Sequence, residues 1–166
     1  MKNKHAQIWS LDLMAGMMLF LVGIMIFFTY TLNQPSEAQD NFEMLFYDGK
    51  IIADSLMSSG YPQQWNSTSA ITIGITDENR INETKLKNLY DITTVDYTST
   101  KRLFNTKYDY YFFFEENMTI DSNEVEGIGK PNANKDNINA RNLIKITRFT
   151  VYQNKTTPLY LYLWEE

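Results

Sequence analysis

The chain contains no cysteine and only one histidine, His5, among its 166 residues. Without cysteine there is no disulfide bond, no thiolate metal ligand and no cysteine nucleophile. Because the single histidine lies in the N-terminal segment, the usual histidine–nucleophile pairs and zinc sites are excluded as well. We therefore expect no catalytic residue, no cofactor and no metal, and a domain held together by its apolar core alone.

Basic residues are also scarce, with 15 lysines and arginines against 20 aspartates and glutamates. Beyond residue 12 the net charge is −6, which argues against a nucleic-acid partner, because phosphate binding needs a basic face. The segment 121–127 is rich in side-chain oxygens. It lacks the glycine and glutamate that an EF-hand calcium loop requires, because Glu126 and Asn132 stand at those positions. We interpret this segment as a solvated acidic loop.

Residues 13–32 form a long apolar run that contains neither charge nor proline. As a helix these 20 residues span about 30 Å, the thickness of the hydrocarbon core of a bilayer. Trp9 precedes the run and Tyr30 lies near its end, as is typical of residues at a membrane interface. The sequence therefore predicts one transmembrane helix. A buried core helix and a cleaved secretory signal, with a small-residue site at 36–38, are the alternatives.

The charges that flank this run predict its orientation. Lys2 and Lys4 precede it, whereas Glu37, Asp40 and Glu43 follow it. Lysine on a short flank favours the cytoplasmic side of the membrane. We therefore expect a cytoplasmic stub at 1–12, a membrane span at 13–32 and an extracellular domain at 33–166, in a single-pass protein of the cell membrane.

The segment 4–12 resembles the class III signal peptide of archaeal type IV prepilins: a basic stub, a small residue, Gln7 and an acid at the head of an apolar helix. The resemblance implies cleavage by a prepilin peptidase between Ala6 and Gln7, with the apolar stretch retained. Asp12 then matches the acidic position that pairs with the N-terminal amine of a neighbouring subunit. Asp12 would be the sixth mature residue rather than the fifth, and His5 replaces the commoner lysine or arginine. An uncleaved anchor with Asp12 in the lipid headgroups remains the alternative.

The region after the anchor predicts an α+β domain. Beyond an interruption at Pro35, apolar residues at helical spacing predict an amphipathic helix over 37–58, similar to the second half of the first helix of a type IV pilin. The expected buried residues of this helix are Phe42, Leu45, Phe46, Ile52, Ala53 and Leu56. Its end is marked by Gly60-Tyr61-Pro62.

Further along the chain, patterning predicts the sheet. The expected elements are a strand at 70–76, helices at 82–90 and 99–104, a strand at 108–115, a long exposed loop at 116–139, and a hairpin formed by 143–153 and 158–164. In the last strand leucines alternate with Tyr160, Tyr162 and Trp164, so both sheet faces should be partly covered. The expected architecture is a long N-terminal helix packed on a mainly antiparallel four-stranded sheet.

Four Asn-x-Ser/Thr sequons follow the anchor, at Asn66, Asn82, Asn117 and Asn154. Asparagine glycosylation takes place outside the cytoplasm, on exposed loops, so these positions fit the predicted topology. At Asn82 a helix-capping role would compete with modification.

Two functions are compatible with these features. The first is a pilin-like or pseudopilin structural subunit of an archaeal surface filament or secretion-like assembly. It would self-assemble, or join other pilin-like subunits, through its N-terminal helix. The second is an uncleaved, membrane-anchored extracellular binding domain, either an adhesin or a sensor. The mature N-terminus discriminates between the two, because only the first predicts a chain that begins at Gln7.

Overall fold

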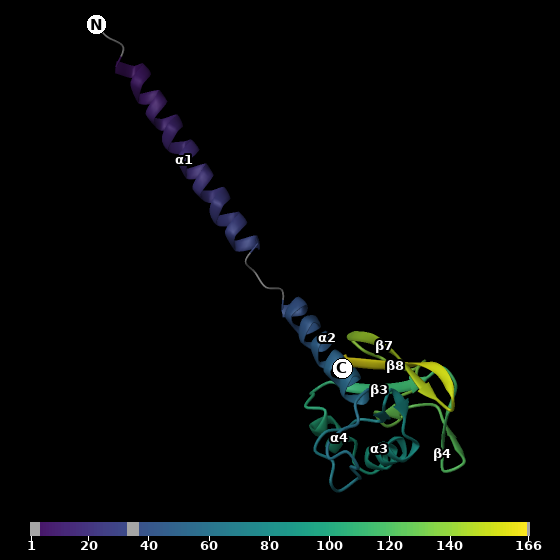
Figure 1. Cartoon of the computed structure of the whole chain (residues 1–166). Coiled ribbons are helices and arrows are strands. Elements are labelled where there is room, and N and C mark those ends of the chain that lie inside the picture. Colours follow the sequence, from purple (N-terminus) through teal and green to yellow (C-terminus); the bar gives the residue numbers. More distant parts are fainter. Residues whose placement is uncertain (1–3, 33–36, 166) are drawn as a thin grey trace. The chain divides into compact units, whose positions relative to one another are not determined.

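The computed structural model describes residues 4–32 and 37–165, with side chains described for 11–32 and 41–165. The chain divides into two compact units, residues 1–40 and 41–166 (Figure 1). The interruption expected at Pro35 lies outside the described residues.

The first unit is dominated by one long helix, α1 (Lys4–Leu32). Its apolar part, Leu11–Leu32, has 22 residues, and none of it is buried by the rest of the chain. The hydroxyl of Thr29 donates to the carbonyl of Met25 at 2.8 Å, so this polar group is satisfied within the helix. The helix is long and apolar enough for a membrane anchor or a signal sequence, which agrees with the expected span.

The helix α2 (Glu37–Leu56) lies on the sheet of the second unit (Figure 1). Leu45, Ile52 and Leu56 are almost completely buried, as expected. A Cβ atom at Gly49 would come within 3 Å of Ile144, so the helix approaches the sheet more closely here than a side chain would permit.

Two of the residues expected in this buried face are exposed instead. Phe42 is 49% exposed and Phe46 is 53% exposed. Phe42 lies on the buried face but one turn before Leu45, and Phe46 lies on the flank of the helix. Helical spacing gives the direction of the apolar face but not where the contact with the sheet ends.

The main sheet has six strands in the order β1-β2-β7-β8-β3-β6. Their bounds are β1 (Thr76–Asp77), β2 (Arg80–Ile81), β3 (Asp109–Phe114), β6 (Ile128–Gly129), β7 (Asn142–Tyr152) and β8 (Lys155–Glu165). All pairs are antiparallel except β2 with β7, which meet in parallel at Arg80 and Val151. The α+β class is confirmed, and the sheet is mainly antiparallel with this one parallel pair, but the expected number of four strands is wrong.

The two additional strands of this sheet are β2, at 80–81, and β6, which lies in the segment expected to be a loop, 116–139. It contains β6 and a separate hairpin of β4 (Met118–Ile120) and β5 (Asn123–Val125). Asp121 and Ser122 turn this hairpin, and both have positive φ angles, of 50° and 67°. These strands are too short to produce a readable alternation, and the turn lacks a glycine signal.

The strand expected at 70–76 is also largely wrong, since only Thr76 belongs to β1. Ile73 and Ile75 are fully buried, so the alternation correctly indicates burial. The backbone N–H of Ile75, however, donates to the carbonyl of Leu56 at the end of α2 rather than to a neighbouring strand. Apolar alternation indicates which side chains point inward, but not which groups form hydrogen bonds with the backbone.

Two short helices follow, α3 (Glu83–Val95) and α4 (Tyr97–Leu103). Asn82 caps α3 as expected, with its side-chain oxygen accepting from the N–H of Lys85 at 3.1 Å. Asp96 caps α4 by accepting from the N–H of Ser99, so this helix begins two residues before its expected start. The ends of both helices thus depend on capping side chains.

The β7–β8 hairpin is tighter than expected. Its turn is Gln153–Asn154, with φ angles of 48° and 62°, and β8 already begins at Lys155. Positive φ at both central residues is the geometry of a two-residue hairpin loop. Pro158 is tolerated within β8, because the pairing of β3 with β8 begins only at Leu159.

Both faces of the sheet are covered, as the alternation in β8 predicts. Leu159, Leu161 and Leu163 are fully buried in the main core, which also contains the inner face of α2. On the other face Tyr111, Phe113 and Trp164 form a smaller cluster. The cover of this second face comes from the chain itself: Ala133, Ile138 and Ala140, in the segment between β6 and β7, pack against the aromatic rings.

Candidate functional site

The N-terminal processing and assembly residues all fall on α1. Ala6 and Gln7 belong to its helical backbone, but their side chains lie outside the described part of the structure. Asp12 is exposed, near the start of the apolar stretch. No geometry that brings these three residues together is described, so the predicted cleavage site stays a prediction.

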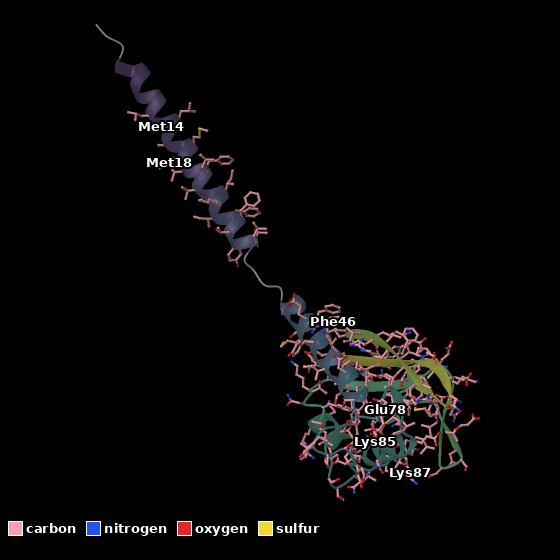
Figure 2. The ribbon with its side chains drawn as sticks, viewed as in Figure 1. Met14, Met18, Phe46, Glu78, Lys85 and Lys87 are labelled. Atoms are coloured by element: carbon pink, nitrogen blue, oxygen red, sulfur yellow. The ribbon has the colours of Figure 1, made fainter. Side chains whose placement is uncertain are left out.

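The apolar surface of α1 is the most exposed hydrophobic surface that the structure describes. Side chains project from it all around, Met14 and Met18 among them (Figure 2). Leu19 is 74% exposed and Phe20 is 67% exposed. A helix that is apolar all round is suited to lipid or to other apolar helices rather than to water.

The outward flanks of α2 carry a second apolar surface. Met44, Phe46, Tyr47 and Ile51 are each about half exposed, and Phe46 is labelled in Figure 2. The polar residues Glu43, Lys50 and Asp54 separate the two flanks at the back of the helix. A helix with one apolar face buried and apolar flanks left exposed has surface available for a further partner.

Three of the four sequons are exposed. The side-chain oxygen of Asn66 accepts from the hydroxyl of Thr68 at 2.9 Å, within a turn. Asn117 donates to Glu124 at 3.3 Å, and Asn154 accepts from Arg80 at 3.3 Å. Asn117 and Asn154 each make one exposed hydrogen bond, whereas the side-chain oxygen of Asn66 accepts four, from the N–H and hydroxyl groups of Thr68 and Ser69. All three asparagines remain exposed.

Asn82, the asparagine of the fourth sequon, is partly buried and is held by hydrogen bonds within the domain. Besides capping α3, its amide donates to the carboxylate of Asp77 at 2.7 Å. Lys85, which is 5% exposed, donates to the same carboxylate at 2.5 Å. The hydrogen bonds from Lys85 and Asn82 hold the pKa of Asp77 below its usual value. The Asp77–Asn82–Lys85 cluster joins β1 to α3 and, through the carbonyl of Ser59, to the segment after α2.

Asn117 and Asn154 lie at one end of the sheet, where Lys155 pairs with Glu116 at 3.6 Å. Gly49 of α2 lies against Ile144 near the other end, and Asp54, further along the helix, pairs with Arg148, nearer the β7–β8 turn. The chain therefore enters the domain near one end of the sheet and carries two exposed sequons at the other.

A second, partly buried polar cluster surrounds Asp109 at the start of β3. Its carboxylate accepts from Lys101 at 2.9 Å, from Lys130 at 2.8 Å and from the hydroxyl of Tyr97 at 3.1 Å. Burial raises the pKa of this carboxyl, but the hydrogen bonds from Lys130 and Lys101 offset that effect and hold the pKa below its usual value. The cluster connects α4, β3 and the segment after β6, and no local sequence pattern indicates it.

A cavity of about 330 Å³ lies at the β6 edge of the sheet. Tyr90, Thr93 and Thr94 of α3 line one wall, Tyr111 of β3 lines another, and the segment 126–133 closes it. Sequence reasoning did not identify this cavity, because its walls come from parts of the chain that are far apart in sequence.

The acidic segment 121–127 forms the turn and second strand of the β4–β5 hairpin rather than an open loop. Asp121 pairs with Lys87 of α3 at 2.6 Å. In the described part of the chain, no three histidine, cysteine or acidic side chains come together as metal ligands do.

No protein-family model, no curated protein and no solved structure matches this chain. The interpretation of its function therefore depends on its own residues and geometry.

Proposed function

We propose that the chain is a type IV pilin-like structural subunit that assembles through its N-terminal helix and presents its α+β domain outside the cell. The observation that carries this proposal is the contrast between the two units. The 22-residue apolar stretch of α1, Leu11–Leu32, is exposed on all sides, while the second unit buries its own core without it. The domain therefore leaves α1 free to contact lipid or helices of other subunits.

The polar residues of the N-terminal segment support the same proposal. A carboxylate at the membrane boundary, such as Asp12, is costly unless it is paired. Cleavage before Gln7 would create an amine on each subunit, and the amine of one subunit could pair with Asp12 of the next. Such a pair would set the stagger between neighbouring helices and would make assembly dependent on processing.

The proposed orientation follows from the charges and the sequons. Lys2 and Lys4 favour a cytoplasmic N-terminus. Asn117 and Asn154 are exposed at the end of the sheet away from the start of α2. Glycans at these two positions would lie at the end of the sheet opposite the one where the chain enters the domain.

The mature N-terminus tests the proposal. We expect protein from membranes of the native host to begin at Gln7, and Ala6→Trp to block this cleavage while Ala6→Gly permits it. Electron microscopy should then show filaments for the processed chain and for Asp12→Glu, and their loss for Asp12→Ala. An intact mass that retains Lys2, or filaments that are unaffected by Asp12→Ala, would contradict the proposal and favour a solitary anchored domain.

A further inference from the structure

The cavity at the β6 edge has the properties of a preformed binding site. Its volume of about 330 Å³ falls in the range of small-molecule pockets. The closing segment is fixed in place: the N–H of Lys130 donates to the carbonyl of Tyr110, and its ammonium pairs with Asp109. The N–H of Ala133 in turn donates to the carbonyl of Lys130. The walls are therefore held by backbone and charged contacts before any ligand arrives.

Tyr111 is the feature that points to a ligand. The residue is 5% exposed, its side chain lines the cavity, and its hydroxyl has no hydrogen-bond partner among the described residues. This hydroxyl is not itself enclosed, so it can bond to solvent when the cavity is empty and to a ligand when the cavity is filled. Tyr108 also has an unpartnered hydroxyl, but that atom is completely enclosed. At Tyr111 the polar group instead borders a cavity that a ligand can enter.

The orientation of Tyr111 is fixed by the backbone beside it. A Cβ atom at residue 127 would lie within 2.6 Å of the ring and hydroxyl of Tyr111, so only glycine allows this contact. Burial, together with the charge of Glu126, raises the pKa of Tyr111 to about 12. The hydroxyl is therefore protonated at neutral pH and can donate a hydrogen bond.

The other lining groups restrict the chemistry of the ligand. Glu126 supplies a carboxylate acceptor and Asn132 an amide. The hydroxyl of Thr94 donates to the carbonyl of Tyr90, which leaves its lone pairs free to accept. Lys130 already pairs with Asp109, so the site offers no uncommitted cation for an anionic ligand. The lining thus combines the acceptors of Glu126 and Thr94, the amide of Asn132 and the hydroxyl of Tyr111 with the tyrosine and proline rings.

We propose that this cavity binds a neutral carbohydrate, at the scale of one pyranose unit. A pyranose ring has an apolar C–H face that can pack on Tyr90 or Tyr111. Its hydroxyl groups can donate to Glu126 and Thr94 and accept from Tyr111. This inference does not depend on assembly, because a filament subunit and a solitary anchored domain could both carry the site.

Saturation-transfer NMR on the full chain in lipid nanodiscs, which carry no sugar headgroups, tests this site. The probes are the methyl glycosides of glucose, galactose, mannose and N-acetylglucosamine at millimolar concentration, with empty nanodiscs as the blank. We expect saturation transfer to at least one of them. We expect Tyr111→Phe, which removes only the hydroxyl, to weaken binding about tenfold, the factor that about 1.4 kcal/mol represents. Tyr160→Phe, a change on the same sheet face outside the cavity lining, should leave binding unchanged.

Two results would overturn the inference. The first is the absence of transfer to all four glycosides. The second is binding that Tyr111→Phe leaves as strong as in the parent chain, since the sugar would then lie elsewhere. Circular dichroism of each variant confirms that its fold is retained. The N-terminal sequence and filaments of the same preparations report separately on the proposed assembly, so failure of one proposal is distinguishable from failure of the other.

Discussion

The two units of this chain use the same kinds of residue in opposite ways. In α1, Leu19 and Phe20 are about 70% exposed, whereas in the domain Leu161 and Phe112 are completely buried. The difference lies in how apolar residues are distributed around each element. They surround α1, so no single contact within the chain can cover them, whereas in α2 and β8 they occupy one face that the domain can bury. The apolar side chains of the first unit can therefore be buried only by surrounding molecules, whereas those of the second unit are buried by the unit itself.

Removal of residues 1–36 tests most directly whether the second unit folds without the first. We expect the remaining chain, 37–166, to leave the membrane fraction completely and to fold in solution, because α1 contributes nothing to the buried core. Membrane fractionation and thermal unfolding followed by circular dichroism measure the two effects. Truncation through residue 58 also removes α2 and should abolish cooperative unfolding. If the 37–166 chain failed to fold, α1 would be part of the domain and the division into two self-sufficient units would be wrong.

This comparison also explains what the sequence could predict. The apolar stretch of α1 and the leucine alternation in β8 are local periodic patterns, and the structure confirms the helix and the burial. The prediction that Phe42 and Phe46 are buried is wrong, because the limits of a packed helix face depend on the extent of the sheet beneath it. Local pattern was thus reliable for the direction of burial and unreliable for its limits.

Features that depend on distant residues were not predicted. The Asp109 cluster combines residues from α4, β3 and the segment after β6, and the Tyr111 cavity combines α3 with the same segment. No spacing in the sequence signals such combinations, since chain topology brings them together. Asn82 is an intermediate case, because its cap role could be predicted from sequence but its bond to Asp77 could not.

Two adjacent isoleucines of α2 allow buried and exposed apolar side chains to be compared within one helix. Ile52 is fully buried and Ile51 is 44% exposed. In the 37–166 chain we expect Ile52→Ala to lower the free energy of unfolding by about 2–5 kcal/mol, because it leaves a cavity in the core. Ile51→Ala should lower it by less than about 1 kcal/mol. Urea unfolding at equilibrium measures both values.

Equal losses for the two isoleucine variants would mean that the outward flank of α2 is buried in solution, either by the domain or by another copy. Repeating the measurement at several protein concentrations separates these cases. Only burial by another copy makes the stability depend on concentration.

The smallest expected effect concerns the partly buried carboxylate of Asp109, and it separates polar from apolar contributions to the stability of the domain. The pKa of Asp109 is lower in the folded state than in the unfolded chain, so its contribution is present above the unfolded pKa and is lost as pH falls through the folded pKa. We expect Asp109→Asn to lower the free energy of unfolding of 37–166 by about 1–3 kcal/mol at pH 7, because Lys101 and Lys130 lose their shared carboxylate. Urea unfolding between pH 7 and pH 2 should show a smaller loss of stability on acidification, below about pH 4, in the variant than in the parent.

Asp54→Asn is the matched control, because Asp54 also pairs with a cation, Arg148, but its side chain is 55% exposed. It should cost less than about 1 kcal/mol. Parallel pH profiles for the parent and Asp109→Asn would show that the cluster positions the segment after β6 without stabilising the fold.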